Sequence, residues 1–444
     1  MQTILSVAEP FDKLLKKQKV KTVEQYRPMN FVVEQPVKEG LLLYHTMTKA
    51  LVLLTPEEAE LYKTVPTSLP DLISEWFLVP LTHDDRLLSR QMRDVARMLK
   101  KHSKAITTYT ILTTTDCNAR CFYCYEMGRP RVPMTADIAW QTADYIIRHC
   151  EKKKVTLAWF GGEPLYNKPV ITLICQQLKD AGIKFSSRMV SNGYLFDDDT
   201  IQEARQLWLL KRIQITLDGT EKIYNRSKAY IYKNVNAYQR VIGNIHKLQE
   251  SGIHVTIRLN IGLHNSDDLM ELAHELHHEF PDTKGVEVYI HPLFEEEKGQ
   301  STHHDDAREE LYHKLWDISE RLEDYGLLQK STLKHLVKTS RCIADNDNCL
   351  IVTPGGKLGK CEHYSEDHFV GHINNDNFDQ NVIGDFKALH EEIEACKTCF
   401  YYPNCIWLNL CPNDKNCYPE IREDKIRKVR RGILTIYKNF KKQA

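Results

Sequence analysis

The sequence predicts an α/β fold: a partial (β/α)6 barrel with an N-terminal α+β domain before it and a cysteine-rich domain after it. Between Tyr109 and Pro292, short apolar runs alternate with amphipathic segments, and the first hundred residues lack that alternation. Eight of the 13 cysteines lie between positions 342 and 417. A chain of 444 residues is also too long for one ordinary core, so we expect several domains.

Six apolar runs predict the strands of a parallel sheet. They lie at 109–114, 156–160, 185–191, 212–217, 254–261 and 286–292. Helices are predicted between them at 134–150, 168–182, 198–209, 237–251 and 267–280. Parallel neighbours need crossover connections, which these helices provide. The alternation therefore indicates a TIM-like barrel, in which chemistry collects where strands end and loops begin.

The segments outside the barrel are predicted to fold separately. Residues 31–65 have the pattern of a β-hairpin followed by a helix, with a further helix near 84–101, and a polar amphipathic helix at 305–328 bridges to the cysteine-rich end. We therefore expect domains at 1–103, 104–300 and 341–444, with the bridge at 301–340.

Charge and hydropathy exclude several classes of partner. Lysine plus arginine equals aspartate plus glutamate, 60 against 60, so we expect no nucleic acid and no acidic membrane as a partner. The basic tail at 425–442 has helical spacing and is interpreted as a solvated helix face. No run of about 18 apolar residues exists, and the N-terminus lacks a signal peptide's order, so we expect a cytoplasmic protein.

Cysteines in a reducing compartment more often ligate metal than form disulfides. Cys150 and Cys175 are isolated within predicted helices and are interpreted as packing residues. The other 11 cysteines are clustered. Their spacing decides what they bind.

Three of them follow the first predicted strand in the segment TTTDCNARCFYCYE, as C-x3-C-x2-C at Cys117, Cys121 and Cys124. Three thiolates in one loop can bind three irons of a four-iron cluster and leave the fourth iron without a protein ligand. An open position of this kind is a site for a cofactor or a substrate. A structural zinc site is the alternative, but it requires four closed ligands.

This loop resembles the motif of the radical S-adenosylmethionine (SAM) superfamily, which has an aromatic residue before the last cysteine, as Tyr123 is here. The resemblance implies that the amino and carboxylate groups of SAM chelate the open iron of a 4Fe–4S cluster. It also implies that one electron cleaves SAM to methionine and a 5′-deoxyadenosyl radical, which abstracts hydrogen from the substrate. The cofactor carries that chemistry and the protein orients it.

The ends of the next strands carry the other candidate cofactor contacts. Gly161, Gly162 and Glu163 follow the second strand, where glycines allow close backbone approach and a carboxylate can accept hydrogen bonds. The resemblance places this motif beside the SAM amino group. It places Ser191 and Asn192, at the end of the third strand, near the ribose and the SAM carboxylate.

The fourth and fifth strands add two further candidates. Asp218 ends the fourth strand and could face the adenosyl group or the substrate. The fifth strand carries Arg258 and Asn260, and an arginine suits a carboxylate. Each of these residues could instead be an ordinary strand-end cap.

Eight cysteines near the C-terminus supply two sets of four thiolates, the ligand count of two closed four-iron clusters. A pair of zinc ribbons is the alternative. The pattern resembles the SPASM extension of radical SAM enzymes. That resemblance implies one auxiliary cluster on Cys342, Cys349, Cys361 and Cys411, and an outer one on Cys396, Cys399, Cys405 and Cys417. The gap after Cys405 departs from the usual pattern, so the pairing is less firmly implied than the clusters.

Glu362 directly follows Cys361. In members of the family that mature sulfatases, a carboxylate at this place takes the substrate proton, so Glu362 is the candidate catalytic base. An exposed loop glutamate is the alternative.

The segment His274-Glu275-Leu276-His277-His278 satisfies H-E-x-x-H, the motif of zinc proteases. Its helix is predicted on the outer wall of the barrel, away from the strand ends and without an obvious third ligand. A solvent-facing helix is the better interpretation.

The SPASM resemblance implies a substrate that is a peptide or protein. The N-terminal segment loosely resembles leader-peptide recognition domains, which add a peptide strand to a sheet edge. We therefore expect a maturase that binds a ribosomal precursor peptide with its leader and installs a thioether or carbon–carbon crosslink, using SAM, three 4Fe–4S clusters and an electron donor such as flavodoxin or ferredoxin. The alternatives are anaerobic sulfatase maturation, which makes formylglycine, and a degenerate partner that only binds peptide.

Overall fold

The computed structural model of the chain describes residues 1–8, 25–64, 69–99, 105–151, 153–233, 235–293, 305–330, 333, 340, 342–363, 368–388, 392–405 and 417–443. Its contacts divide the chain into two compact units. The first unit comprises Met1–His102, Lys330–Asn346 and Lys387–Ala444, and the second comprises Ser103–Gln329 and Asp347–Phe386. The four-segment division expected from the sequence stays a prediction.

The second unit, the barrel unit, is built on a nine-stranded sheet with the order β12-β11-β10-β9-β8-β7-β13-β14-β15. Six of these strands are β7 (Thr108–Leu112), β8 (Lys154–Phe160), β9 (Lys184–Ser191), β10 (Leu210–Thr216), β11 (His254–Ile261) and β12 (Val286–Pro292). Each pairs in parallel with the next one along the chain. All six predicted strands are therefore present, with ends shifted by at most two residues.

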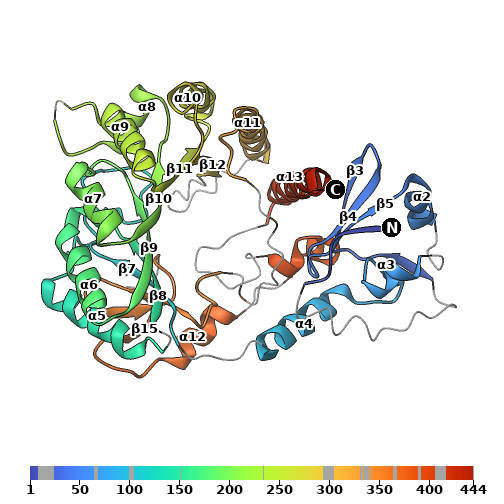
Figure 1. Ribbon diagram of the computed structural model, residues 1–444, viewed down its shortest axis with the longest axis horizontal. Coiled ribbons are helices and arrows are strands. Elements are labelled where there is room, and N and C mark those ends of the chain that lie inside the picture. The colour runs from blue at the N-terminus through green and yellow to red at the C-terminus, as the bar shows by residue number, and fades with distance from the viewer. Residues whose placement is uncertain are drawn as a thin grey trace. The chain divides into compact units, whose positions relative to one another are not determined.

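Helices connect these strands and lie on the outer side of the curved sheet (Figure 1). They are α5 (Ala136–His149), α6 (Lys168–Asp180) after a short turn η2 (Pro164–Asn167), α7 (Asp198–Gln206), α9 (Ala237–Glu250) and α10 (Ser266–Glu279). The helix α11 (Asp305–Asp324) follows β12, the last of the six strands. Side chains at the N-caps fix several starts: Thr135 accepts from the Ile138 amide and Asp197 from the Thr200 amide. The sequence did not predict α8 (Glu221–Lys228), which precedes α9.

Three strands extend the barrel sheet beyond β7. The strand β13 (Cys349–Val352) pairs in parallel with β7, with Cys349 opposite Thr108. It continues antiparallel into β14 (Lys357–Gly359) and β15 (Phe369–His372), and α12 (Gln380–Lys387) follows. The turn between β13 and β14 places Gly356 at φ +81°, where a Cβ would approach the Ile373 side chain to 2.9 Å. Part of the cysteine-rich segment therefore belongs to the barrel sheet.

The first unit contains the N-terminal module, defined here as residues 1–8, 25–64 and 69–99. Its antiparallel sheet has the order β1 (Gln2–Leu5), β5 (Leu51–Leu54), β4 (Gly40–His45), β3 (Val32–Val37). A smaller sheet pairs β2 (Tyr26–Pro28) with β6 (Leu78–Pro80), and the helices are α2 (Pro56–Thr64), α3 (Pro70–Ser74) and α4 (Asp85–Leu99). The hairpin and the two helices predicted from the sequence are present.

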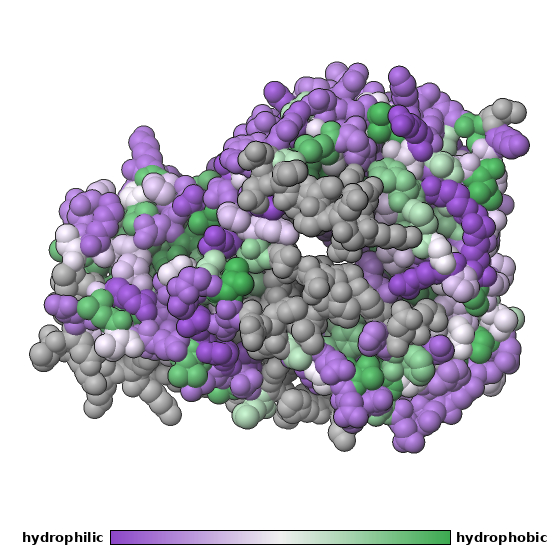
Figure 2. All heavy atoms as spheres, turned by 180° about the vertical axis from the view of Figure 1, so that it is seen from behind, coloured by the Kyte–Doolittle hydropathy of each residue, from purple (hydrophilic) through white to green (hydrophobic). Residues whose placement is uncertain are grey.

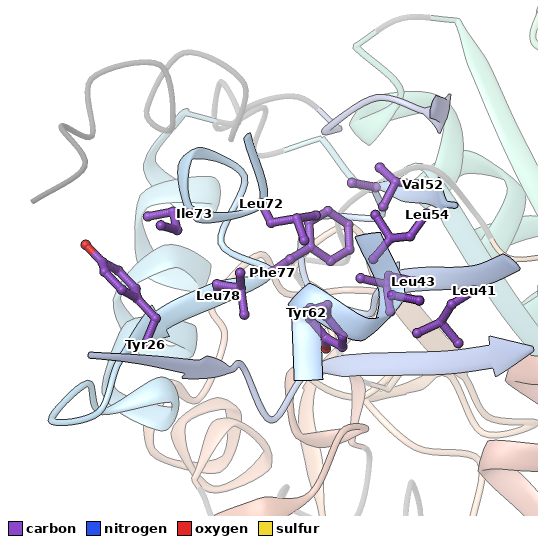
Figure 3. Packing of buried hydrophobic residues seen from close by; sticks show 12 residues of the cluster. Tyr26, Leu41, Leu43, Val52, Leu54, Tyr62, Leu72, Ile73, Phe77 and Leu78 are labelled. Atoms are coloured by element: carbon purple, nitrogen blue, oxygen red, sulfur yellow. The ribbon is translucent and has the colours of Figure 1, made fainter. Parts of the chain in front are cut away.

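A hydrophobic core joins the strands and helices of this module. Leu43 and Val52 from the sheet, Tyr62 from α2, and Leu72 and Phe77 around α3 converge in it (Figure 3). Burial of such side chains gives about 1.5–3 kcal/mol each. The module thus has a core of its own.

The C-terminal end belongs to the same unit. It comprises η3 (Glu394–Thr398), η4 (Tyr402–Asn404) and the long helix α13 (Pro419–Gln443). The predicted helix of the basic tail is therefore present. Val429, Ile433 and Tyr437 of this helix pack against Val33 and Tyr44 of the N-terminal sheet. The apolar side of the tail is a packing face.

On the face drawn in Figure 2, hydrophilic residues predominate among the described residues, and hydrophobic ones are scattered between them. Among the described helices, none combines the length and the apolar character that a membrane crossing requires.

Candidate active site

The loop after β7, here called the cysteine loop and spanning residues 113–134, carries Cys117, Cys121 and Cys124. Its two ends are joined by backbone hydrogen bonds from Thr115 to Val132 (3.0 Å) and from Met134 to Thr113 (2.9 Å). The three cysteines are free thiols of intermediate exposure. Burial raises the pKa of Cys117 to about 12, and Glu163, Cys121 and Cys124 raise it further, because their negative charges oppose a thiolate. Cys121 and Cys124 therefore lie close enough to Cys117 for their charges to affect its ionisation.

These residues fit an iron–sulfur cluster by the chemistry of their donor set. The pKa of a buried thiol is raised in the metal-free protein, but metal binding deprotonates it and the thiolate becomes the ligand. Two N–H groups already point at the Cys117 sulfur: the Ala119 amide at 3.3 Å and the Asn192 side-chain amide at 3.7 Å. Such bonds stabilise thiolate ligands of clusters. Within the described ranges, no three His, Cys, Asp or Glu side chains are grouped as ligands of a metal ion.

Gly161 and Gly162 pack against the backbone of the cysteine loop. The Gly162 amide donates to Thr114 O and the Glu163 amide to Asp116 O, both at 2.9 Å. A Cβ on Gly161 would collide with the Thr114 carbonyl oxygen, and one on Gly162 with that of Asp116. Glycine is therefore required here because backbone meets backbone. From the sequence we expected these glycines to let the backbone approach the cofactor. In the structure they approach the backbone of Thr114 and Asp116, just before Cys117.

Glu163 joins the ends of β8 and β9. Its carboxylate is fully buried and accepts hydrogen bonds from the Ser191 hydroxyl (2.9 Å), the Asn192 amide (2.8 Å) and the Leu165 amide (3.1 Å). Burial raises its pKa to about 7, against the lowering effect of those hydrogen bonds. The Asn192 side chain in turn bonds to Asn118 at 2.6 Å, next to Cys117. Three predicted cofactor contacts thus form one hydrogen-bonded group with the cysteine loop.

Tyr123 belongs to a second buried group. Its hydroxyl donates to a carboxylate oxygen of Asp218, and Lys228 lies 2.9 Å from the same carboxylate. Lys228 is only 3% exposed and Asp218 1%. Burial alone would lower the pKa of Lys228, but Asp218 and Tyr123 hold it well above the ordinary value. The loop aromatic is thereby fixed to the end of β10.

The end of β11 completes this group. Asn260 donates to Asp218 Oδ1 at 3.0 Å, and Asn265 donates to the Asp218 carbonyl at 2.8 Å. Arg258 donates from Nε to Asn260 Oδ1 at 2.8 Å. The predicted residues of β10 and β11 therefore lie together, with Asp218 turned toward protein partners.

Glu362 and its neighbour His363 lie beside the cysteine loop. The His363 ring is 4.3 Å from the Tyr125 ring, and Arg129 donates to the His363 carbonyl at 2.7 Å. Glu362 is partly exposed, and its charge adds to the effect of burial in raising the pKa of Tyr125. The candidate base thus borders the residues that follow Cys124.

The C-terminal cysteines divide between the two units. In the barrel unit, Cys349 is the first residue of β13 and Cys361 follows β14, whereas Cys342 belongs to the first unit. Cys411 lies outside the described residues. The remaining set, Cys396, Cys399, Cys405 and Cys417, lies in the first unit. Burial raises the pKa of Cys417, and the charges of Cys399 and Cys396 raise it further, so these three thiols lie near one another.

The side chains of the H-E-x-x-H segment contact other side chains of the protein. His277 stacks on Tyr325 at 4.0 Å between ring centroids, and His274 bonds to the Tyr325 hydroxyl. Glu275 accepts a hydrogen bond from Tyr238 at 2.7 Å. The described residues thus show these side chains packing against α9 and the end of α11.

Sequence reasoning missed Lys228 and Asn118. Lys228 ends a short polar helix whose other lysine, Lys222, is exposed, so nothing local distinguishes it from a surface residue. Asn118 lies inside the cysteine motif and is fully buried. Its position between Cys117 and Cys121 was the feature of the sequence that could have marked it as a site residue.

Comparisons with known proteins agree with this geometry. Residues 111–276 match the model of the Radical SAM superfamily. The GTP 3′,8-cyclase of Clostridium perfringens (strain SM101 / Type A) is 25% identical over 283 residues, which cover 60% of this chain and 84% of the relative. A structure of native anSMEcpe with bound AdoMet is similar with a TM-score of 0.58 at 15% identity, over 76% of this chain and 100% of that one. Native anSMEcpe with AdoMet and the Cp18Cys peptide gives 0.57 at 15% identity, over 76% and 99%.

Proposed function

We propose that this chain, an enzyme that carries a radical SAM domain, is a peptide maturase that binds a ribosomal precursor peptide and crosslinks residues of its core. The radical SAM domain implies SAM and a 4Fe–4S cluster. When bound, these groups supply the electron and the hydrogen-abstracting adenosyl group. A crosslink removes two hydrogens from the peptide. One leaves as the hydrogen atom that the adenosyl group abstracts; the other leaves as a proton, which a base would take, and an electron, which an auxiliary cluster would accept.

The chain's own residues orient that chemistry. Cys117, Cys121 and Cys124 would hold the cluster, and the N–H groups of Ala119 and Asn192 would donate to its first thiolate. Glu163 fixes the end of β9 through Ser191 and Asn192. A cofactor contact at this strand end would therefore be preorganised.

The observation that carries the peptide assignment is the sheet of the N-terminal module. In the described part of the chain its edge strand β3 pairs only with β4. An extended peptide can add to such an edge through main-chain hydrogen bonds. The bound Cp18Cys peptide of a structure with the same fold supports a peptide substrate.

The auxiliary clusters are part of the proposal. Eight C-terminal cysteines supply two sets of four ligands, with the pairing expected from the sequence. Glu362, beside the cysteine loop, is proposed as the base that takes the substrate proton. A flavodoxin or ferredoxin is proposed as the electron donor.

Mass spectrometry after anaerobic incubation with SAM, a reductant and a short cysteine-containing precursor peptide tests the proposal. We expect a loss of two hydrogens from the peptide and formation of 5′-deoxyadenosine. Formation of 5′-deoxyadenosine without that mass loss would exclude a simple crosslink. Incubation with GTP in place of the peptide tests the reaction named for the curated relatives.

Sulfatase maturation is the second candidate, since Glu362 directly follows Cys361 and borders the cysteine loop. It would oxidise a cysteine or serine of the substrate to an aldehyde. Trapping with a hydrazide reagent distinguishes the two, because a crosslinked peptide carries no aldehyde. Glu362→Gln should abolish the aldehyde.

A further inference from the structure

The outer loop, defined here as residues 392–405, packs into the N-terminal module. Cys396, Cys399 and Cys405 lie against a hydrophobic cluster of that module and the loop's own Tyr402. The module's members of the cluster are Met29, Phe31, Met47, Trp76, Val79 and Met92. The Phe31 ring stacks on Tyr402 with centroids 6.1 Å apart. The module therefore forms a wall of the site at which the outer cysteines lie.

Hydrogen bonds attach the outer loop to the turn after β4. The Thr46 hydroxyl donates to the Phe400 carbonyl at 2.6 Å. The Asn404 side chain donates to the Thr46 carbonyl at 3.0 Å and accepts from Lys49 Nζ at 2.9 Å. Arg93 of α4 also donates to the Pro403 carbonyl. Each of these bonds lies within a few residues of Cys399 or Cys405.

Lys49 is the unusual residue of this contact. It lies at φ +67° and is only 6% exposed, in a turn closed by its own amide, which donates to the His45 carbonyl at 2.8 Å. Its ammonium group donates to Asn404 Oδ1 and to the Thr46 carbonyl, so it ties the loop between Cys399 and Cys405 to the turn after β4.

We propose that the outer iron–sulfur site is shared: the N-terminal module supplies its wall and, through Lys49, a hydrogen bond that holds the loop between Cys399 and Cys405, so that cluster binding and folding of the module are coupled. Lys49 is a positioning residue, which acts through Asn404 on the loop between Cys399 and Cys405. Coupling of metal binding to folding is general for cysteine sites whose ligands are not preassembled. The inference rests on the outer cluster of the proposed function and needs no peptide.

Amide hydrogen exchange tests the coupling in the full chain, before and after anaerobic reconstitution. We expect reconstitution to slow exchange across residues 41–54 at least tenfold, because the loaded outer loop holds the turn after β4. In Cys405→Ser this slowing should be lost, while the iron bound by the cysteine loop is kept. Equal slowing in Cys405→Ser and in the unaltered protein would overturn the proposal.

Lys49→Met tests the hydrogen bond from the module to the outer loop, with Lys63→Met as the matched control, since Lys63 lies on the surface of the same module. We expect Lys49→Met to lower the iron content of the outer site at least twofold, because the loop between Cys399 and Cys405 loses its hydrogen bond to the module. Lys49→Arg, which keeps a donor, should retain the iron. Asn404→Ala removes the same hydrogen bond from the loop side. It replaces Lys49→Met in the test if that variant does not fold. Unchanged iron content of the outer site in both Lys49→Met and Asn404→Ala would contradict the proposal. Because no substrate is added, these outcomes are independent of the peptide proposal.

Discussion

The ammonium group of Lys228 donates a 2.8 Å hydrogen bond to the hydroxyl of Tyr123, the residue before the last cysteine of the loop. Lys228 also lies 2.9 Å from Asp218, so the loop aromatic is held by a buried ion pair at the end of β10. Two of the three residues were candidates from the sequence. The third residue, Lys228, completes the group and makes it neutral overall, since one cation faces one carboxylate.

Lys228→Met should destabilise the apoprotein by about 3–5 kcal/mol, because it leaves the buried Asp218 carboxylate without its cation. Urea unfolding measures this, with exposed Lys222→Met on the same helix as the control. Adding Asp218→Asn to Lys228→Met should restore part of the loss. A loss below about 1 kcal/mol, the range of exposed pairs, would show that the pair is not buried as described.

Gly162→Ala should lower the iron content of the cysteine loop, because its Cβ would collide with the Asp116 carbonyl and displace the segment before Cys117. Gly243→Ala in α9 is the matched control: a Cβ there meets no atom within 4 Å. It should leave iron binding unchanged and favour the helix by up to about 1 kcal/mol. Iron and sulfide analysis after reconstitution distinguishes the two variants. Equal iron content would contradict the supporting role of Gly162.

Glu163→Ala should slow 5′-deoxyadenosine formation by about tenfold or more. The substitution removes the acceptor of Ser191 and Asn192, and each buried donor left unpaired costs about 1–3 kcal/mol. Iron content should stay unchanged, because Glu163 is not a ligand. Exposed Glu271→Ala on α10 is the control. Full cofactor cleavage by Glu163→Ala would exclude an orienting role for this carboxylate.

The free energy of unfolding of the apoprotein should fall as the pH drops from about 6.5 toward 3. Burial lowers the pKa of His45 to about 3 from an ordinary value of 6.5, and Lys49 lowers it further. Between these values the unfolded chain binds the proton and the folded chain does not, so acid favours unfolding by up to about 1.4 kcal/mol per pH unit. The contribution is fully present above pH 6.5.

His45→Gln should remove this part of the pH dependence, and exposed His313→Gln should not. Denaturant unfolding at pH 7 and pH 5 makes the comparison. The same slope with pH in His45→Gln and in the unaltered protein would refute the assignment to His45.

The barrel could be predicted because parallel strands are buried on both faces and appear as continuous apolar runs. The run 254–261 is an example, since only His254 and Arg258 of β11 are not buried. The helix α8 escaped prediction because its eight residues, EKIYNRSK, are nearly all polar. The strand β13 (Cys349–Val352) also escaped prediction: the sequence singled out only Cys349, as a cluster ligand, and the pairing partner β7 lies more than 230 residues earlier.

The sequence could predict which strand ends carry the residues of the candidate site. It could not predict which of those residues contact one another. The cysteine spacing identified the loop, and the βα alternation placed Glu163, Asn192 and Asp218 near it. The local pattern could not show that Gly162 meets the Asp116 backbone, or that the outer loop packs on the N-terminal module. Both depend on segments that meet only after the chain has folded.

The most direct test of the central claim is spectroscopy of the cysteine loop coupled to cofactor cleavage. In a background without the C-terminal cysteine ligands, anaerobically reconstituted and reduced protein should show one four-iron cluster by electron paramagnetic resonance, perturbed by SAM, and should form 5′-deoxyadenosine. Replacing Cys117, Cys121 and Cys124 by alanine should abolish the signal and the product. Absence of the cluster in the unaltered loop, or cleavage of SAM that survives the triple substitution, would contradict the account.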